Sequence, residues 1–322
     1  MDSDTIIGQN EGEQVPVIDL SLLRESTYVE VRKACEEWGC FVVANHGVKE
    51  EIIDGMDSAT RDAFALPKET RQKNAFPRRD FGYISDLPAL PFYESLGVPG
   101  APDRDAIQKF SDQLWPQGNS HICKIIQEYT SDVEELMIEI IKIIFRSFTI
   151  SKYYESQFYA LLRLNYYDIP PNKTGGVSPH ADHDFITILY QDKNGGLEVQ
   201  NKYGRWAKVK FMPNSFIVLM GDCMKAWSNG RIWNCIHRVI MKECETPRVS
   251  LPYFYYFSDE VVINAPPELI DENHPRLYKP FKYPEFRAFY GEMSYKKIQE
   301  FETLRNDTEL PFIDMFALIT IE

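Results

Sequence analysis

Cysteine is scarce in this sequence, and no two cysteines form a Cys-x-x-Cys pair, so the usual spacing of a structural zinc site or a redox motif is absent. The six that are present show no spacing of a disulfide framework: Cys35, Cys40, Cys123, Cys223, Cys235 and Cys244. We therefore expect reduced thiols and a cytoplasmic location.

Positive charge is also in short supply, with 35 Lys and Arg against 48 Asp and Glu and a net charge of −13. Because phosphate backbones are bound by clustered cations, we expect no nucleic-acid partner. No apolar run reaches the length of a membrane span, and residues 1–5 lack the basic and apolar parts of a secretory signal. We expect a freely diffusing monomer that does not bind a membrane.

The 322 residues include 44% hydrophobic and 13% aromatic side chains, enough apolar material for a large core. Residues 1–150 combine short strands with helical patterns near 27–38, 49–64 and 119–148. Residues 151–322 carry short apolar runs separated by turn signals, followed by a helical tail. This pattern predicts a mainly β fold with flanking helices, in which a jelly roll follows a helical N-terminal region. We count the two parts as one catalytic unit.

Residues 67–116 are rich in Pro, Gly and aromatic side chains and show no regular period. Such a stretch is long for a simple connection. Two interpretations stay open, a wall or lid of a substrate pocket and a packed surface excursion.

Two histidines and one aspartate have the composition of an open iron site. His180 and Asp182 are two positions apart, so on an extended strand their side chains would share a face, and His237 would come from a neighbouring strand. Two imidazoles and a carboxylate on one face of octahedral Fe(II) leave positions for a cosubstrate and O2. His183 forms a competing His-x-x-His pair with His180, but a period of three does not suit a strand, so we place it in the pocket lining or behind the ligands.

Arg248 and Ser250 repeat the two-residue step and would present a guanidinium and a hydroxyl on one face. This pair suits a carboxylate. One end of an oxoacid could be held there while its other end chelates the metal.

With these residues in place, the chain resembles the plant 2-oxoglutarate- and Fe(II)-dependent dioxygenases over nearly its whole length. The motifs that carry the resemblance are the metal and Arg-x-Ser residues together with residues 15–20, 45–47, 164–167, 196–199, 221–222 and 227–231. Within the family, residues 114–119 and 275–281 are similar to the branch of auxin-oxidising, glucosinolate side-chain and other specialised-metabolite enzymes.

The resemblance implies an isopenicillin N synthase-like fold and a set of site residues. His180, Asp182 and His237 would bind Fe(II), Arg248 and Ser250 would bind 2-oxoglutarate, and Tyr167 and Asn165 would assist. The implied reaction is hydroxylation, demethylation or desaturation of a small metabolite or hormone with O2, releasing succinate and CO2, with ascorbate as reductant.

Candidate substrate residues are Arg163, His183, Phe185, Phe254 and Tyr256. Arg163 shares the strand face of Asn165 and could contact a substrate acid, or it could form a latch ion pair instead. The aromatic end of residues 253–257 suits a flat or polycyclic substrate, and it equally suits ordinary strand packing.

Two other classes of function stay open at this point. One is an oxidase of the same fold that does not use 2-oxoglutarate, and the other is a non-catalytic jelly-roll binding protein. Succinate formation would separate the first from the dioxygenase, and the complete ligand set argues against the second.

Overall fold

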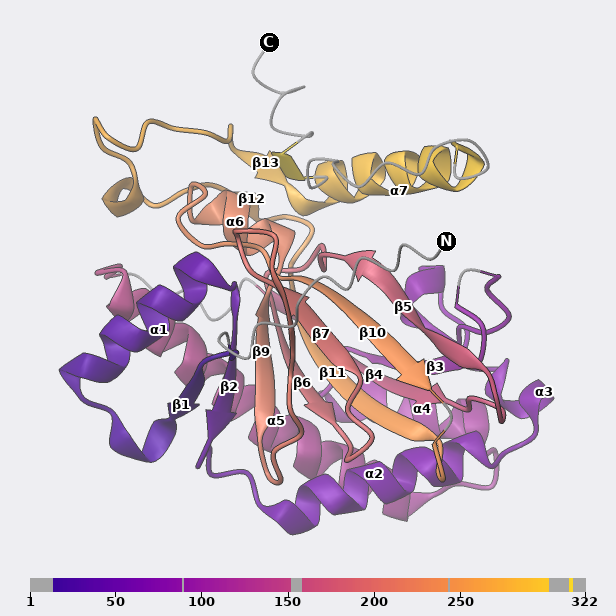
Figure 1. Cartoon of the computed structure of the whole chain (residues 1–322). Helices are drawn as coiled ribbons and strands as arrows, with labels where there is room; N and C mark the ends of the chain where they lie inside the picture. Colours follow the sequence, from indigo (N-terminus) through magenta and orange to yellow (C-terminus); the bar gives the residue numbers. More distant parts are fainter. Residues whose placement is uncertain (1–13, 89, 152–157, 243, 301–312, 315–322) are drawn as a thin grey trace, which may run out of the picture.

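The computed structural model describes residues 14–88, 90–151, 158–242, 244–300 and 313–314. Two sheets face each other in the middle of the molecule, and helices cover the outside of the larger one (Figure 1). The larger sheet has seven strands in the order β1-β2-β9-β6-β11-β4-β3, and the smaller has four in the order β5-β10-β7-β8. The strands of the large sheet are β1 Val17–Asp19, β2 Cys40–Ala44, β3 Tyr93–Pro99, β4 Phe158–Tyr167, β6 Ile186–Gln191, β9 Phe216–Met220 and β11 Arg248–Phe257.

The small sheet consists of β5 Thr174–His180, β7 Leu197–Gln200, β8 Trp206–Lys208 and β10 Ile236–Lys242. A separate pair is formed by β12 Val262–Ile263 and β13 Phe281–Lys282. The α-helices are α1 Glu25–Glu37, α2 Glu50–Phe64, α3 Lys68–Arg71, α4 Arg104–Leu114, α5 Ser120–Ser147, α6 Asp222–Trp227 and α7 Tyr283–Glu300. The predicted jelly roll with flanking helices is confirmed, and no helix of the described residues is long and apolar enough to cross a membrane.

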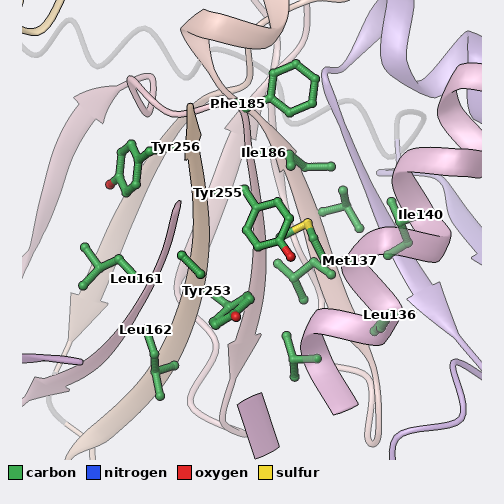
Figure 2. Close-up of a cluster of buried hydrophobic side chains, with 14 of the residues drawn as sticks. Leu136, Met137, Ile140, Leu161, Leu162, Phe185, Ile186, Tyr253, Tyr255 and Tyr256 are labelled. Carbon is green, nitrogen blue, oxygen red and sulfur yellow. The ribbon is translucent and has the colours of Figure 1, made fainter. Parts of the chain in front are cut away.

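The long helix α5 forms as its apolar stripe predicts. Asn119 caps it, because its side-chain oxygen accepts a hydrogen bond from the Ile122 amide at 3.1 Å. Figure 2 shows Leu136, Met137 and Ile140 directed at the outer face of the large sheet. This contact is the main hydrophobic core of the protein, and it makes α5 a scaffold element.

Strand β11 divides its side chains between this core and the interior. Tyr253 and Tyr255 face outward, where their hydroxyls donate to the Ala101 carbonyl and to Glu134 of α5, both at 2.8 Å. Tyr256 lies on the other side of the strand (Figure 2). The same alternation puts Arg248 and Ser250 inside, because side chains change face at every residue.

Residues 67–116, which show no regular period in the sequence, contain regular elements in the structure. They include α3, β3 and α4, and β3 pairs with β4 along the edge of the large sheet from Tyr93 to Pro99. The stretch is therefore part of the barrel wall. Gly97 and Pro99 lie in β3, whereas Gly100 and the Ala101-Pro102 cis bond lie in the turn between β3 and α4.

Strand β5 was also missed by the pattern of apolar runs. Its sequence, residues 174–180, contains two glycines and a proline, which are rare in strands. Gly176 is required there, since its φ is +143° and a Cβ would lie 1.8 Å from the Val239 carbonyl oxygen on β10. Close approach of two backbones therefore determines this strand.

Removing side-chain volume at the contact between α5 and the sheet should destabilise the fold. Ile140 is 1% exposed, so we expect Ile140→Ala to lower the free energy of unfolding by about 3 kcal/mol. Glu139 is the matched control, because it is the exposed neighbour on the same helix and should change stability by less than about 0.5 kcal/mol when replaced by Ala. Urea denaturation followed by circular dichroism measures both, and equal stabilities would contradict this account of the core.

Candidate functional site

The three predicted metal ligands lie together inside the barrel. His180 ends β5 and pairs in register with His237 on β10, and their ring centroids are 4.2 Å apart. Asp182 Oδ1 lies 3.6 Å from His180 Nε2 and 3.8 Å from His237 Nε2. The ligand atoms of the three residues all lie within 4.8 Å of one another.

Strand parity does not explain the position of Asp182, because β5 ends at His180 and Asp182 lies in the segment that follows. Two hydrogen bonds hold it instead. The Asp222 amide at the start of α6 donates to the Asp182 carbonyl at 2.8 Å, and the Thr187 hydroxyl lies 3.1 Å from Asp182 Oδ2. Asp182 therefore lies beside the two histidines, as expected, but strand parity is not the reason.

Both imidazoles are oriented as metal ligands require. His180 Nδ1 lies 2.9 Å from the Ser178 carbonyl, and His237 Nδ1 lies 3.1 Å from the Cys235 carbonyl. A carbonyl only accepts, so each Nδ1 carries the hydrogen and each Nε2 keeps a lone pair directed toward Asp182. Desolvation and the neighbouring His237 lower the pKa of His180 to about 4, which keeps it neutral at physiological pH. Two neutral imidazoles and one carboxylate fit a divalent transition metal such as Fe(II).

Thr187 and Asp184 support Asp182 and were not predicted. Thr187 Oγ1 lies 2.8 Å from Asp184 Oδ2 as well as near Asp182. The Thr187 hydroxyl is the donor toward both carboxylates, and burial raises the pKa of Asp184 well above its usual range. Strand alternation could have identified Thr187, because its side chain shares the inner face of β6 with Leu189 and Gln191.

Arg248 forms a buried cationic site further inside the barrel. Its side chain is among the most buried in the protein, at 1% exposure. The guanidinium donates to Ser250 Oγ at 2.8 Å, to Gln191 Oε1 at 3.4 Å and to the Gly195 carbonyl, and it lies 4.8 Å from the centroid of the Tyr167 ring. All of these partners are neutral. A buried charge is costly without a counter-ion, so this arrangement favours an anionic ligand.

Asn165 and Tyr167 lie on β4, the strand next to β11. Asn165 pairs with Ser250, and Tyr167 pairs with Arg248. The side-chain oxygen of Asn165 accepts hydrogen bonds from Tyr93 at 2.9 Å and from Ser95 at 2.7 Å. Its amide hydrogens are thus the groups that can donate to a ligand. Burial raises the pKa of Tyr167, so its hydroxyl stays protonated.

Arg163 acts as a latch in this structure. Its guanidinium is buried and donates to Ser95 Oγ at 2.8 Å, to the Gly82 carbonyl at 3.0 Å and to the Asp80 carbonyl. These bonds tie residues 80–82 to the barrel edge. Of the two interpretations of this arginine, the structure favours the latch, with backbone carbonyls in place of an ion pair.

The structure assigns Phe185 to the core and not to the pocket. It is fully buried, and its ring packs against Phe158, Trp227 and Phe257 behind the large sheet. Phe185 directly precedes β6, and its side chain points to the outer face of the large sheet. The order of residues alone did not reveal this direction.

His183, Phe254 and Tyr256 line the mouth of the barrel. The ring of Tyr256 lies 5.9 Å from Phe254 and 5.4 Å from His183, measured between centroids. Helix α7 crosses this end of the strands (Figure 1), and its Tyr283 and Tyr290 rings lie 6.1 and 4.8 Å from His183. The tyrosines of α7 were not predicted as site residues.

A cavity of about 530 Å³ adjoins Tyr256. Its lining consists of Phe76, Pro77, Arg78, Phe81, Pro99, Ala106, Lys109, Tyr159, Tyr256, Phe257, Ser258 and Asp259. The Arg78 guanidinium lies 3.6 Å from the centroid of the Phe81 ring, and its buried Nε has no hydrogen-bond partner among the described residues. A further cavity of about 460 Å³, between residues 86–94 and Tyr166, contains no predicted substrate residue.

Comparisons with known proteins agree with this geometry. Residues 158–256 match the family model of the 2OG-Fe(II) oxygenase superfamily. Residues 15–90 match a second model, described as non-haem dioxygenase in morphine synthesis N-terminal.

Relatives match over most of their length. The chain is 35% identical over 295 residues to the probable 2-oxoglutarate-dependent dioxygenase AOP1 of Arabidopsis thaliana, covering 86% of this chain and 96% of that protein. It is 32% identical over 284 residues to the 2-oxoglutarate-dependent dioxygenase DAO of Oryza sativa, covering 85% and 93%. A solved complex of 2-oxoglutarate with AtDAO1, named for auxin oxidation in Arabidopsis thaliana, has a TM-score of 0.76 and 30% identity over 82% of this chain and 100% of that chain.

The latch role of Arg163 predicts a local effect of its removal. Arg163→Met should lower the free energy of unfolding by about 2 kcal/mol, because three buried acceptors lose a charged donor. Hydrogen exchange should accelerate at residues 80–84 and stay unchanged in α5. Arg163→Lys should recover part of the protection, since it keeps one donor; unchanged exchange in both variants would rule out the latch.

Proposed function

Because the chain belongs to the 2OG-Fe(II) oxygenase superfamily, we propose that His180, Asp182 and His237 bind its iron. The protein is an oxidoreductase, a 2-oxoglutarate-dependent dioxygenase that oxidises a small specialised metabolite or hormone. The pairing of both Nδ1 atoms with backbone carbonyls supports this ligand set, because it directs both Nε2 lone pairs at the carboxylate.

We further propose that Arg248 and Ser250 bind the distal carboxylate of 2-oxoglutarate, with Tyr167 beside them and the Asn165 amide nearer the metal. The observation that carries this proposal is the burial of Arg248 among neutral partners only. A dianionic oxoacid would supply the missing counter-charge, and the guanidinium fork matches a carboxylate.

Bound Fe(II), 2-oxoglutarate and O2 together supply the oxidising chemistry and release succinate and CO2, with ascorbate as an external reductant. The chain's own residues orient the reactants. Thr187 holds the carboxylate of Asp182, and the apolar interior around Leu189, Val199 and Leu219 keeps water away from the cosubstrate.

For the substrate, we propose a flat aromatic acid. Phe254, Tyr256 and His183 form an aromatic mouth beside the metal ligands, and the cavity next to Tyr256 offers the Arg78 guanidinium with an unpartnered Nε. An aromatic body would pack against these rings while Arg78 binds the acid. The name of AtDAO1 states auxin oxidation, which is consistent with this class.

We also propose that the chain acts as one catalytic unit and as a cytoplasmic monomer. Strands β1 to β3 and strands β4, β6, β9 and β11 share one sheet, so the proposed regions 1–150 and 151–322 are joined by backbone hydrogen bonds. All six cysteines are unpaired, which is consistent with a reducing compartment.

If Asp182 is an iron ligand, removing its carboxylate should remove both iron binding and activity. Asp182→Ala should abolish both Fe(II) binding and succinate release, because two imidazoles alone leave the site with a weaker charge and an incomplete face. The exposed Asp112→Ala is the control and should bind iron normally. Bound iron per chain and succinate are measured in parallel, and substrate oxidation without succinate would identify an oxidase that does not use 2-oxoglutarate.

The substrate proposal predicts a preference for acids. Indole-3-acetic acid should bind the protein loaded with Mn(II) and 2-oxoglutarate more tightly than the neutral indole-3-ethanol, and Arg78→Gln should weaken acid binding by roughly tenfold, the worth of one charged hydrogen bond. The exposed Arg104→Gln on the neighbouring helix α4 is the control. Calorimetry measures these affinities, and equal binding of acid and alcohol would contradict the assignment.

A further inference from the structure

Arg61 of α2 joins three segments of chain at one end of the barrel. Its Nε donates to Asp57 at 2.6 Å, one turn away on the same helix. Its two remaining nitrogens donate to Asp192 Oδ2 at 3.0 Å and to the Pro247 carbonyl at 2.8 Å. Helix α2 runs past the ends of the strands opposite α7 (Figure 1), so this contact lies far from the mouth.

Asp192 is the centre of the turn that follows β6. Its Oδ1 accepts from the Asn194 amide at 3.0 Å, and its carbonyl accepts from the Gly195 amide at 3.0 Å. Its Oδ2, the atom bound by Arg61, also accepts from the Val249 amide at 2.8 Å, and its own amide donates to the Val249 carbonyl at 3.1 Å. One carboxylate therefore joins the turn to the start of β11.

These hydrogen bonds hold the backbone on both sides of Arg248, and they hold the turn that contacts its guanidinium. In sequence it lies between Pro247 and Val249, whose carbonyl and amide are held by Arg61 and Asp192. Its guanidinium is held by Gly195 and Gln191, which belong to the turn that Asp192 organises and to the end of β6. Both the backbone and the charged head of Arg248 thus depend on the pair of Arg61 and Asp192.

Charge explains why an arginine is needed. The Asp192 side chain is only 5% exposed, and a buried carboxylate is stable only when it is paired and hydrogen-bonded. The fork of Arg61 supplies the charge and, at the same time, reaches a carbonyl on a second segment, which a single ammonium group cannot do in the same geometry.

We propose that Arg61 is a positioning residue for 2-oxoglutarate, acting through Asp192 on the orientation of Arg248. It does not touch the ligand. The inference rests on the proposed function, because it assumes that Arg248 binds the oxoacid.

The test measures the affinity of the full-length, Mn(II)-loaded protein for 2-oxoglutarate by calorimetry without air. Arg61→Gln should raise the Kd for 2-oxoglutarate by about tenfold, because a misoriented guanidinium loses one charged contact to the ligand. Arg61→Lys should lie between it and the native protein, since the charge is kept and the fork is lost. Mn(II) affinity should be unchanged, because the metal ligands lie on β5, β10 and the segment after β5.

The matched control is Arg146→Gln. Arg146 forms an ion pair with Glu25 of the same 3.0 Å length, between α5 and α1, and should leave the Kd unchanged. A merely structural role of Arg61 would reduce the number of binding sites per chain and the Tm without altering the Kd, and that result would overturn the proposal. If Arg61→Gln does not fold, Arg61→Lys replaces it: a raised Kd supports the proposal, and an unchanged Kd overturns it.

A double-variant cycle tests the route through Asp192. Asp192→Asn should also raise the Kd, and adding Arg61→Gln to it should raise the Kd by less than Arg61→Gln does alone, because the Arg61–Asp192 bond is already broken and only the bond to the Pro247 carbonyl is left to lose. If the two substitutions raise the Kd independently, so that their fold-changes multiply, Arg61 does not act through Asp192. Failure of the native protein to bind 2-oxoglutarate would instead reject the proposed function, which keeps the two conclusions separate.

Discussion

Strand β11, paired with β4 on one side and β6 on the other, fixes both the hydrophobic core and the barrel interior through its register. Its outward side chains Tyr253 and Tyr255 bond the Ala101 carbonyl before α4 and Glu134 of α5, and its inward side chains include Arg248, Ser250 and Tyr256. A slip of one residue would move every inward group to the core and bury tyrosine hydroxyls in the interior. The packing of α5 therefore determines the register that places the anion site.

Charges inside the barrel are arranged in two separate groups. The first is the carboxylate of Asp182 with two neutral imidazoles, and the second is the cation of Arg248 among neutral partners. Each group is incomplete without a ligand of opposite charge, since unpaired buried charges are costly. A metal ion at the first and an oxoacid at the second would satisfy both, so the same electrostatic requirement selects metal and cosubstrate.

Sequence reasoning succeeded where chemistry depends on a short local pattern, and it failed where a side chain's direction depends on distant backbone. His180 and Asp182 were found through their spacing, although the turn after β5 and the Asp222 amide bring them together. Phe185 was assigned to the pocket because nothing in the local sequence gives its parity. Strand β5 was missed because its glycines are needed only for contact with β10.

Periodicity and residue chemistry are local properties, so the class of fold and the long scaffold helix could be predicted from the sequence. The same local chemistry selected the residues proposed to bind the metal and the anion. Three features follow from the fold alone: the latch formed by Arg163, the bond of Thr187 to the proposed metal ligand Asp182, and the tyrosines that α7 brings to the mouth. The fold also joined Arg61 to Arg248 across 187 positions (248 − 61) through Asp192. Such links depend on which segments the sheet brings into contact, and hydrogen bonds between distant segments leave no period in the sequence.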